Sequence, residues 1–138
     1  MPKTANNHKI SFRVRYGETD QMGVVYHGNY AQYLEMGRVE WLRNLGVSYK
    51  ALEEKGIMLP VIELNLKFKK PALYDDVLTV NTQLIKIPTV KIAFNYEIRN
   101  QKEQLLVTAH TVLAFMDMNK KRPVGCPADI LEKLEDCF

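Results

Sequence analysis

Residues 29–46 read NYAQYLEMGRVEWLRNLG, and this stretch decides the fold. Its apolar residues Tyr30, Leu34, Trp41 and Leu45 recur at helical spacing, so they share one face, while charged residues occupy the others. We therefore expect one long amphipathic helix whose apolar stripe is buried against another element.

Both ends of this helix are signalled. Asn29 is expected to be the N-cap, because its side chain can accept a hydrogen bond from the first turn, and Gly46 can take the left-handed conformation that ends a helix. Gly37, within the helix, costs about 1 kcal/mol relative to Ala. That cost makes sense where another backbone must approach closely, so we expect a sheet packed against this face.

Five other stretches alternate apolar and polar residues at every second position, as half-buried strands do. They are residues 8–16, 62–68, 78–84, 90–98 and 107–115. The short links 87–89 and 100–103 suit hairpins, so the four later strands are expected to form an antiparallel meander. Residues 48–55 add a short second helix that Gly56 ends. The sequence predicts an α+β domain in which a curled antiparallel sheet of about five strands wraps a long central helix.

The composition is that of an ordinary globular protein, with 46% hydrophobic and 25% charged residues. The length of 138 residues, without a repeat or a linker, predicts a single domain over residues 1–138. The net charge of +3 is too small for a nucleic-acid-binding face, although it suits a small anionic ligand that carries phosphate.

The composition and residue spacing also indicate the cellular location and argue against a disulfide or a metal site. There is no apolar run of about 18 residues and no secretory leader, so we expect a cytoplasmic protein without a membrane span. Cys126 and Cys137 lack metal-ligand or disulfide spacing, and we expect both to be reduced, non-catalytic thiols. The histidines at positions 8, 27 and 110 are scattered, so a metal site is not expected.

The chemistry-bearing segment is GETDQMGVVYHGN, residues 17–29, between the first strand and the long helix. The free N–H groups of a first helical turn favour negative charge, so a carbonyl that becomes an oxyanion could use them. Asp20 lies seven residues before His27, which allows the loop to hold its carboxylate near the helix start. An ordinary Asp, with a pKa of about 3.9, is ionised at neutral pH and can act as base or nucleophile. The alternative is an aspartate that only caps a turn.

At this point the sequence resembles a known family. The run VRYGETDQMGVVYHGNY, residues 14–30, is similar to the signature of hotdog-fold acyl-CoA thioesterases of the 4-hydroxybenzoyl-CoA thioesterase family. The helix text YLEMGRVEWLR, residues 33–43, continues the resemblance, as do Leu59, Pro60, Val61, Phe68, Pro71 and Asp76.

The resemblance implies a hotdog fold that forms a homodimer, often a dimer of dimers, with active sites between subunits. It implies hydrolysis of an acyl-CoA, with Asp20 as nucleophile or general base and the N–H of His27 polarising the thioester carbonyl. Coenzyme A is then part of the substrate, and no separate cofactor is expected. The expected substrate contacts are Tyr26, Gly28 and Asn29 at the helix start and Thr89, Val90 and Lys91 at the start of the fourth strand.

Three alternatives stay open. Glu35 on the helix is a rival carboxylate, although an i,i+3 ion pair with Arg38 is the commoner role for such a residue. The protein could instead bind acyl-CoA or an acyl carrier protein without catalysis. It could also be a thioesterase that acts on an acyl carrier protein.

Overall fold

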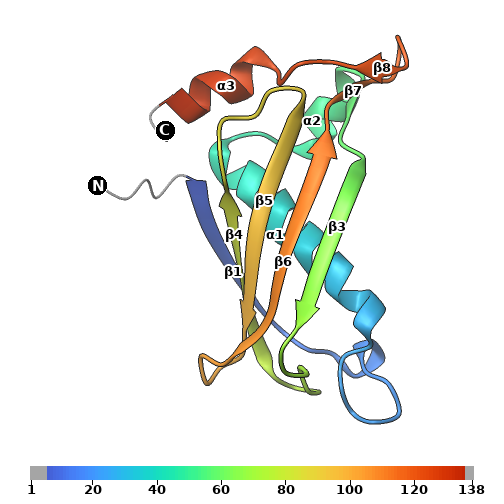
Figure 1. Cartoon of the computed structure of the whole chain (residues 1–138), viewed down its shortest axis with the longest axis vertical. Helices are drawn as coiled ribbons and strands as arrows, with labels where there is room; N and C mark the ends of the chain where they lie inside the picture. Colours follow the sequence, from blue (N-terminus) through green and yellow to red (C-terminus); the bar gives the residue numbers. More distant parts are fainter. Residues whose placement is uncertain (1–5, 136–138) are drawn as a thin grey trace.

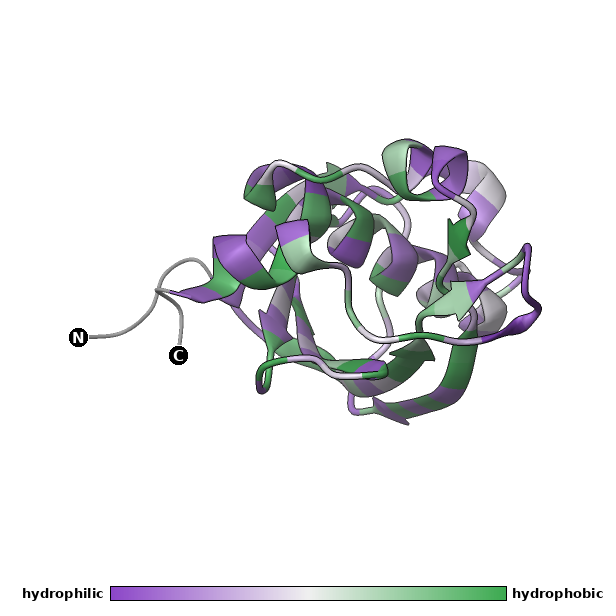
Figure 2. Cartoon of the chain, turned by 90° about the horizontal axis from the view of Figure 1, so that it is seen from above, coloured by the Kyte–Doolittle hydropathy of each residue, from purple (hydrophilic) through white to green (hydrophobic). Residues whose placement is uncertain are grey.

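The computed structural model describes residues 6–135. Its elements, in chain order, are β1 (Asn7–Arg13), two short 3-10 turns (Tyr16–Glu18 and His27–Asn29), α1 (Tyr30–Leu45), α2 (Tyr49–Glu54), β2 (Ile57–Met58), β3 (Val61–Phe68), β4 (Val77–Leu84), β5 (Lys91–Arg99), β6 (Leu105–Ala114), β7 (Met116–Asp117), β8 (Arg122–Pro123) and α3 (Ala128–Leu134). The long helix α1 crosses behind a five-stranded sheet (Figure 1). Seen from above, the strands curve around one side of that helix (Figure 2).

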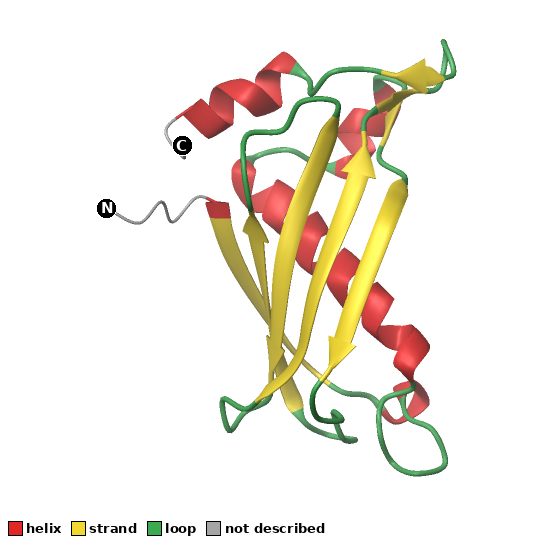
Figure 3. Ribbon diagram, in the orientation of Figure 1, coloured by secondary structure: helices red, strands yellow, loops and turns green. Residues whose placement is uncertain are grey.

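The sheet is antiparallel throughout, with strand order β1-β4-β5-β6-β3 (Figure 3). The predicted meander is therefore right for β4, β5 and β6 but wrong for β3, which pairs with β6 instead of β4. The link of residues 69–76 is longer than a hairpin turn, and it carries the chain across to the other side of the sheet. There β4 pairs with β1. The strand β3 is left as one edge of the sheet.

The first strand is shorter than its alternating pattern predicts. It ends at Arg13, and Tyr16 lies exposed in a 3-10 turn instead of continuing the strand. The cause is local, because the Glu18 carboxylate accepts hydrogen bonds from the backbone N–H and the side chain of Arg15. This arrangement closes a turn that competes with the strand ladder.

The helix α1 buries its apolar stripe against the sheet as predicted. A Cβ on Gly37 would lie 2.5 Å from Thr82 Oγ1 and 3.0 Å from Val80 Cγ1, so the close approach expected at this glycine is confirmed. Gly46 ends the helix with φ of 96°, also as predicted. The second helix is confirmed too, and its N-cap Ser48 accepts a hydrogen bond from the Ala51 N–H.

The prediction for Asn29 is wrong. A 3-10 turn begins at His27 and runs directly into α1, so Asn29 already has helical backbone angles and makes no side-chain cap. Its Nδ2 donates instead to the backbone oxygen of Glu18, at 2.8 Å. The helical tip that faces the preceding loop therefore begins at His27.

Within residues 6–135, no helix is long and apolar enough to cross a bilayer, and no cluster of three or more potential metal-binding side chains forms. Cys126 is a free thiol whose pKa burial raises to about 12, so it is a poor nucleophile. Cys137 lies outside the described residues.

Candidate active site

The loop before the helix folds back on itself as a small hairpin. Thr19 and Val25 form an antiparallel bridge, and the Asp20 N–H donates to the Val24 oxygen at 2.9 Å. Gly23, with φ of 80°, supplies the left-handed residue of the turn. Because Val24 lies only three residues before His27, the hairpin returns Asp20 to the chain segment that leads into the helix tip, a geometry that the seven-residue spacing allows.

The Asp20 carboxylate both holds this turn and keeps one oxygen free. Its Oδ1 accepts the Met22 N–H at 2.8 Å, which is the turn-capping role considered above. Its Oδ2 accepts no hydrogen bond from residues 6–135, and the residue is exposed. The turn-capping role and the chemical role are therefore compatible.

The tip of the helix presents unpaired donors. The backbone N–H groups of His27 and Gly28 find no acceptor in the described part of the chain, and both residues are exposed. Such groups at a helix N-terminus favour an anion or a polarised carbonyl oxygen. The Tyr26 ring covers this backbone, because a Cβ on Gly28 would lie 2.7 Å from Tyr26 Cε2. Tyr26 also stacks on the His27 ring, with centroids 4.4 Å apart.

Glu18 holds the hairpin and the helix together, and the sequence reasoning missed it. Its backbone oxygen accepts the Tyr26 N–H and the Asn29 amide, and its carboxylate accepts from Arg15 and from the Tyr33 hydroxyl at 3.1 Å. Burial opposes ionisation of Glu18, but the hydrogen bonds from Arg15 and Tyr33 outweigh it and lower the pKa of this carboxyl. The signal in the sequence was the Arg15–Glu18 spacing of three.

A cavity of about 320 Å³ opens beside the helix tip. It is lined by Val25, His27, Tyr30, Phe68, Lys69, Lys70 and Pro71, and Asp20 is not among its lining residues. The chain 69–71 after β3 thus brings two basic side chains, Lys69 and Lys70, next to His27. The predicted contacts Thr89, Val90 and Lys91 are not among its lining residues.

Thr89, Val90 and Lys91 do not meet the helix tip within one subunit. They lie at the upper end of the sheet beside α3, whereas the hairpin lies at the lower end beside the start of α1 (Figure 1). The nine-residue β5 separates the two ends by roughly 25–30 Å. The exposed Val90 side chain and the Lys91 side chain are accessible there. Their role as coenzyme A contacts stays a prediction.

Glu35 does not pair with Arg38, so that expectation is wrong. Arg38 is only 6% exposed and lies between α1 and the sheet, where its guanidinium interacts with the hydroxyls of Tyr49 and Tyr96. Its position four residues after Leu34, on the buried face of α1, explains this. Glu35 is exposed and lines cavities on both sides of the helix.

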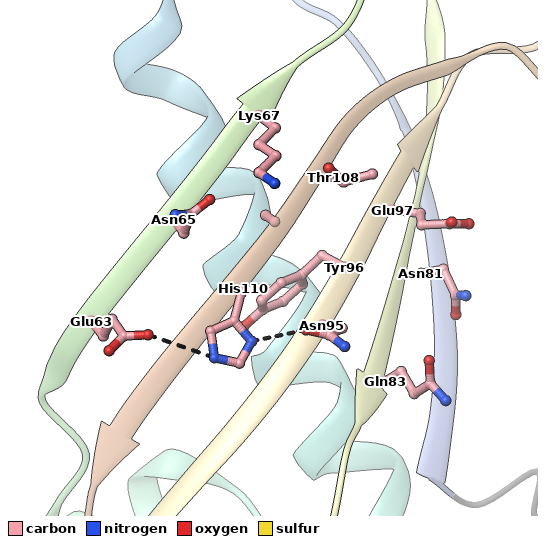
Figure 4. Close-up of a pocket in the computed structure, with 11 residues that line it drawn as sticks. Glu63, Asn65, Lys67, Asn81, Gln83, Asn95, Tyr96, Glu97, Thr108 and His110 are labelled. Carbon is pink, nitrogen blue, oxygen red and sulfur yellow. Dashed lines mark hydrogen bonds and ion pairs between the residues drawn. The ribbon is translucent and has the colours of Figure 1, made fainter.

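A cavity of about 620 Å³ lies on the outer face of the sheet, opposite α1 (Figure 4). Its lining is mostly amide, hydroxyl and charged side chains, which alternate with buried residues in β4, β5 and β6 and with apolar residues in β3. His110 Nδ1 lies 2.8 Å from Asn95 Oδ1, and its Nε2 lies 3.7 Å from Glu63 Oε2. His110 thus faces outward, on the face of the sheet opposite α1.

The comparison with protein families identifies the fold's relatives. A model described as the thioesterase-like superfamily matches residues 14–134, nearly the whole described chain. The chain belongs to this family. It is therefore a thioester hydrolase, and the expected enzyme class is confirmed.

Individual thioesterases resemble it along most of their length. A putative acyl-CoA thioesterase, YneP of Bacillus subtilis, is 35% identical over 116 residues, which are 84% of each chain. A chloroplastic acyl-acyl carrier protein thioesterase of Arabidopsis thaliana is 31% identical over 91% of this chain and 66% of its own length. The solved structure of a DHNA-CoA thioesterase from Staphylococcus aureus superposes with a TM-score of 0.83, at 36% identity, over 86% of this chain and 80% of its own. The hotdog fold implied by the resemblance is thus confirmed.

Proposed function

We propose that this thioesterase hydrolyses acyl-CoA thioesters, with Asp20 as the catalytic carboxylate and the helix tip at His27 as the oxyanion site. The observation that carries the proposal is the pair of unpaired N–H groups at the tip, beside a hairpin that presents a carboxylate with a free oxygen. The acyl-CoA thioesterase among the relatives supports the choice of substrate class.

The carbonyl oxygen of the thioester accepts the His27 N–H, and the positive end of the helix stabilises the charge that develops on it. One such donor is typically worth about 2.7–4 kcal/mol of barrier. Asp20 either attacks the carbonyl carbon or takes a proton from the attacking water, and both routes stay open. The C–S bond breaks and the thiolate leaves, taking up a proton in solution. Where Asp20 is the nucleophile, water then cleaves the acyl anhydride formed on its carboxylate, which releases the acid and restores Asp20. A thiol with a pKa of about 8.5 leaves as the thiolate without protonation by a strong acid. The chemistry requires no metal and no cofactor other than the coenzyme A of the substrate.

A homodimer formed through β3 completes this site. The strand β3 is a free edge of eight residues, and its apolar side chains are unusually exposed, with Ile62 at 51%, Leu64 at 47% and Phe68 at 55%. An exposed apolar edge is a template for another strand. Two-fold symmetry makes the same edge of a second copy pair with it antiparallel.

That pairing places opposite ends of the two sheets next to each other. The end of β3 near Phe68, beside His27, then lies against the Val61 end of the partner's β3. The upper end of the partner's sheet, with its residues 89–91, approaches the helix tip of this subunit. This accounts for the distance between the two groups of predicted substrate contacts in one subunit. Assembly into a dimer of dimers stays a prediction.

The test is release of free thiol from a panel of acyl-CoA substrates. Replacing Asp20 with Asn keeps the shape of the side chain but makes it a far weaker base, and we expect kcat to fall by roughly 10²–10⁴-fold with little change in the unfolding midpoint. The matched control is Asp75→Asn, an exposed loop carboxylate that pairs with Arg13 and should keep the wild-type rate. An Asp20→Asn variant with full activity would refute the assignment.

An acyl carrier protein is the second candidate carrier, because one of the relatives is named for that substrate. Comparing kcat/KM for one acyl group on coenzyme A and on an acyl carrier protein decides between the two. We expect the coenzyme A thioester to be the better substrate. Saturable binding without release of thiol from either carrier would contradict the enzyme assignment.

A further inference from the structure

The link of residues 69–76, between β3 and β4, lies as a third strand beside the hairpin of residues 19–25 that carries Asp20. Val24 in the hairpin and Leu73 in the link form an antiparallel bridge. Two backbone hydrogen bonds flank this bridge, from the Val25 N–H to the Ala72 oxygen at 2.8 Å and from the Tyr74 N–H to the Gly23 oxygen at 3.2 Å. The position of the hairpin therefore depends on the position of the link.

Two side chains hold the link in place, one from each side. From the helix, the hydroxyl of Tyr30 accepts the N–H of the fully buried Ala72 at 3.2 Å. From the link itself, the Asp76 carboxylate accepts two hydrogen bonds: Oδ2 accepts the Leu73 N–H at 2.9 Å, and Oδ1 accepts Gln101 Nε2 at 3.0 Å. Asp76 thus fixes the turn whose first residue bridges to the hairpin.

Gln101 reaches the link from the turn between β5 and β6, which lies at the same end of the sheet as the link and the hairpin (Figure 1). Its amide uses both polar atoms there, because Nε2 donates to Asp76 and Oε1 accepts the Val77 N–H at 3.0 Å. The amide can satisfy a carboxylate and an N–H in this way only in one orientation. Gln101 is exposed, so it contributes these two hydrogen bonds and no core packing.

The Asp20 carboxylate moves with the hairpin, because the hydrogen bonds of Asp20 within residues 6–135 are made inside it. Its N–H donates to the Val24 oxygen at 2.9 Å, and its Oδ1 accepts the Met22 N–H at 2.8 Å. Displacement of a reacting group by about 1 Å can reduce a rate roughly 10²-fold. Contacts run from Gln101 through Asp76 and the link to the hairpin, so a shift at either residue displaces Asp20.

We propose that Asp76 and Gln101 are positioning residues for Asp20. The inference rests on the proposed function, in which Asp20 is the catalytic carboxylate. Neither Asp76 nor Gln101 is among the residues that line the cavity beside His27. A change at either residue should therefore lower kcat and leave KM nearly unchanged, because it displaces the reacting carboxylate and removes no contact with bound substrate.

Single variants disturb the donor and acceptor pattern without removing a side chain. Asp76→Asn replaces one acceptor with a donor, which then faces another N–H, and Gln101→Glu sets a second carboxylate against Asp76. We expect each to lower kcat by about tenfold or more in the thiol-release assay. The matched control is Gln104→Glu in the same turn. Gln104 Oε1 accepts from Asn100 Nδ2, and a glutamate keeps that acceptor, so kcat should stay at the wild-type value.

The double variant Asp76→Asn with Gln101→Glu restores the pattern in reverse. The amide nitrogen at position 76 then donates to the carboxylate at position 101, whose other oxygen still accepts the Val77 N–H. The oxygen at position 76 still accepts the Leu73 N–H. We expect kcat to recover to within about threefold of the wild type. A double variant that is no faster than the single variants would overturn the pairing of these two residues.

The Asp20→Asn background separates positioning from a general structural role. A loss of folded protein would lower kcat by the same factor whether or not the Asp20 carboxylate is present. If Gln101 acts through Asp20, then Gln101→Glu should change the residual kcat of the Asp20→Asn protein by less than about twofold. An equal factor in both backgrounds would overturn the inference.

The outcomes keep this inference apart from the proposed function. If the wild type releases no thiol, or Asp20→Asn keeps full activity, the proposed function is wrong. If Asp20→Asn is impaired while either single variant keeps the wild-type kcat, the proposed function stands and this inference is overturned. Because Gln101 is exposed, Gln101→Glu decides alone if Asp76→Asn does not fold.

Discussion

Replacing Gly37 with Ala tests the contact that sets the position of α1 and hence of its tip. The new Cβ would lie 2.5 Å from Thr82 Oγ1 and 3.0 Å from Val80 Cγ1, and both partners are fully buried. An ordinary van der Waals contact between the new Cβ and Thr82 Oγ1, at about 3.4 Å, requires the helix and the sheet to separate by roughly 0.9 Å. Overpacking of this kind costs about 1–3 kcal/mol. The gain in helix propensity from Gly to Ala, about 1 kcal/mol, offsets part of it.

We therefore expect a net loss of about 1 kcal/mol. Urea unfolding should show it as a fall of roughly 0.3–1 M in the midpoint at unchanged slope. All variants are compared at one protein concentration, because unfolding of a dimer depends on it. Gly17→Ala is the control, since a Cβ there meets nothing within 4 Å.

A double-mutant cycle identifies the cause of the loss. Thr82 Oγ1 is buried and has no hydrogen-bond partner among residues 6–135, so Thr82→Ala removes the closest contact and breaks no hydrogen bond seen there. In that background Gly37→Ala should cost about 1 kcal/mol less, although Val80 still limits the rescue. A Gly37→Ala protein that is as stable as the wild type, or more stable, would refute the reasoning.

Two further predictions concern the dimer and the hairpin. Leu64→Lys places a charge in the exposed apolar edge of β3, and we expect a monomer that releases less thiol, as measured by analytical ultracentrifugation and by activity at one protein concentration. The control Gln83→Lys, on the outer face of β4, should stay a dimer. A dimeric, active Leu64→Lys protein would contradict the proposed interface. Because the folded-state pKa of Glu18 lies below its ordinary value of 4.5, its ionised form stabilises the fold above that pH, and this contribution is lost as the pH falls through the lowered pKa. Urea midpoints of Glu18→Gln and wild type should therefore differ at pH 7 and converge near pH 3, and an equal difference at both pH values would exclude this role.

The local patterns in the sequence identified most elements because each pattern follows from backbone geometry. The spacing of Tyr30 to Leu45 and the glycines at 37 and 46 located α1 and its close approach to the sheet. Alternation located the strands but says nothing about pairing, so the position of β3 at the edge beside β6 was missed. The predicted ion pair between Glu35 and Arg38 is wrong because the prediction used only the i,i+3 spacing and did not consider that Arg38 lies on the buried face of α1.

The site was predictable only in part, for a similar reason. The loop motif predicts Asp20 and His27 as site residues, and the structure shows how the hairpin returns the chain from Asp20 toward His27. The proximity of Lys69 and Lys70 to His27 depends on where the chain leaves β3, which no local pattern specifies. Glu18 holds the hairpin to the helix through its backbone oxygen as well as its carboxylate. Because every residue has a backbone oxygen, the residue type does not indicate this role.

In the proposed mechanism, the helix tip at His27 polarises a thioester carbonyl held beside Asp20. The most direct test is the infrared carbonyl band of an acyl-CoA labelled with ¹³C at the thioester carbon, bound to the Asp20→Asn protein, with the unlabelled complex subtracted. Donation from the His27 N–H weakens the C=O bond, so we expect a band at lower wavenumber than that of the same thioester free in buffer. A bound thioester whose carbonyl band is unshifted would contradict it.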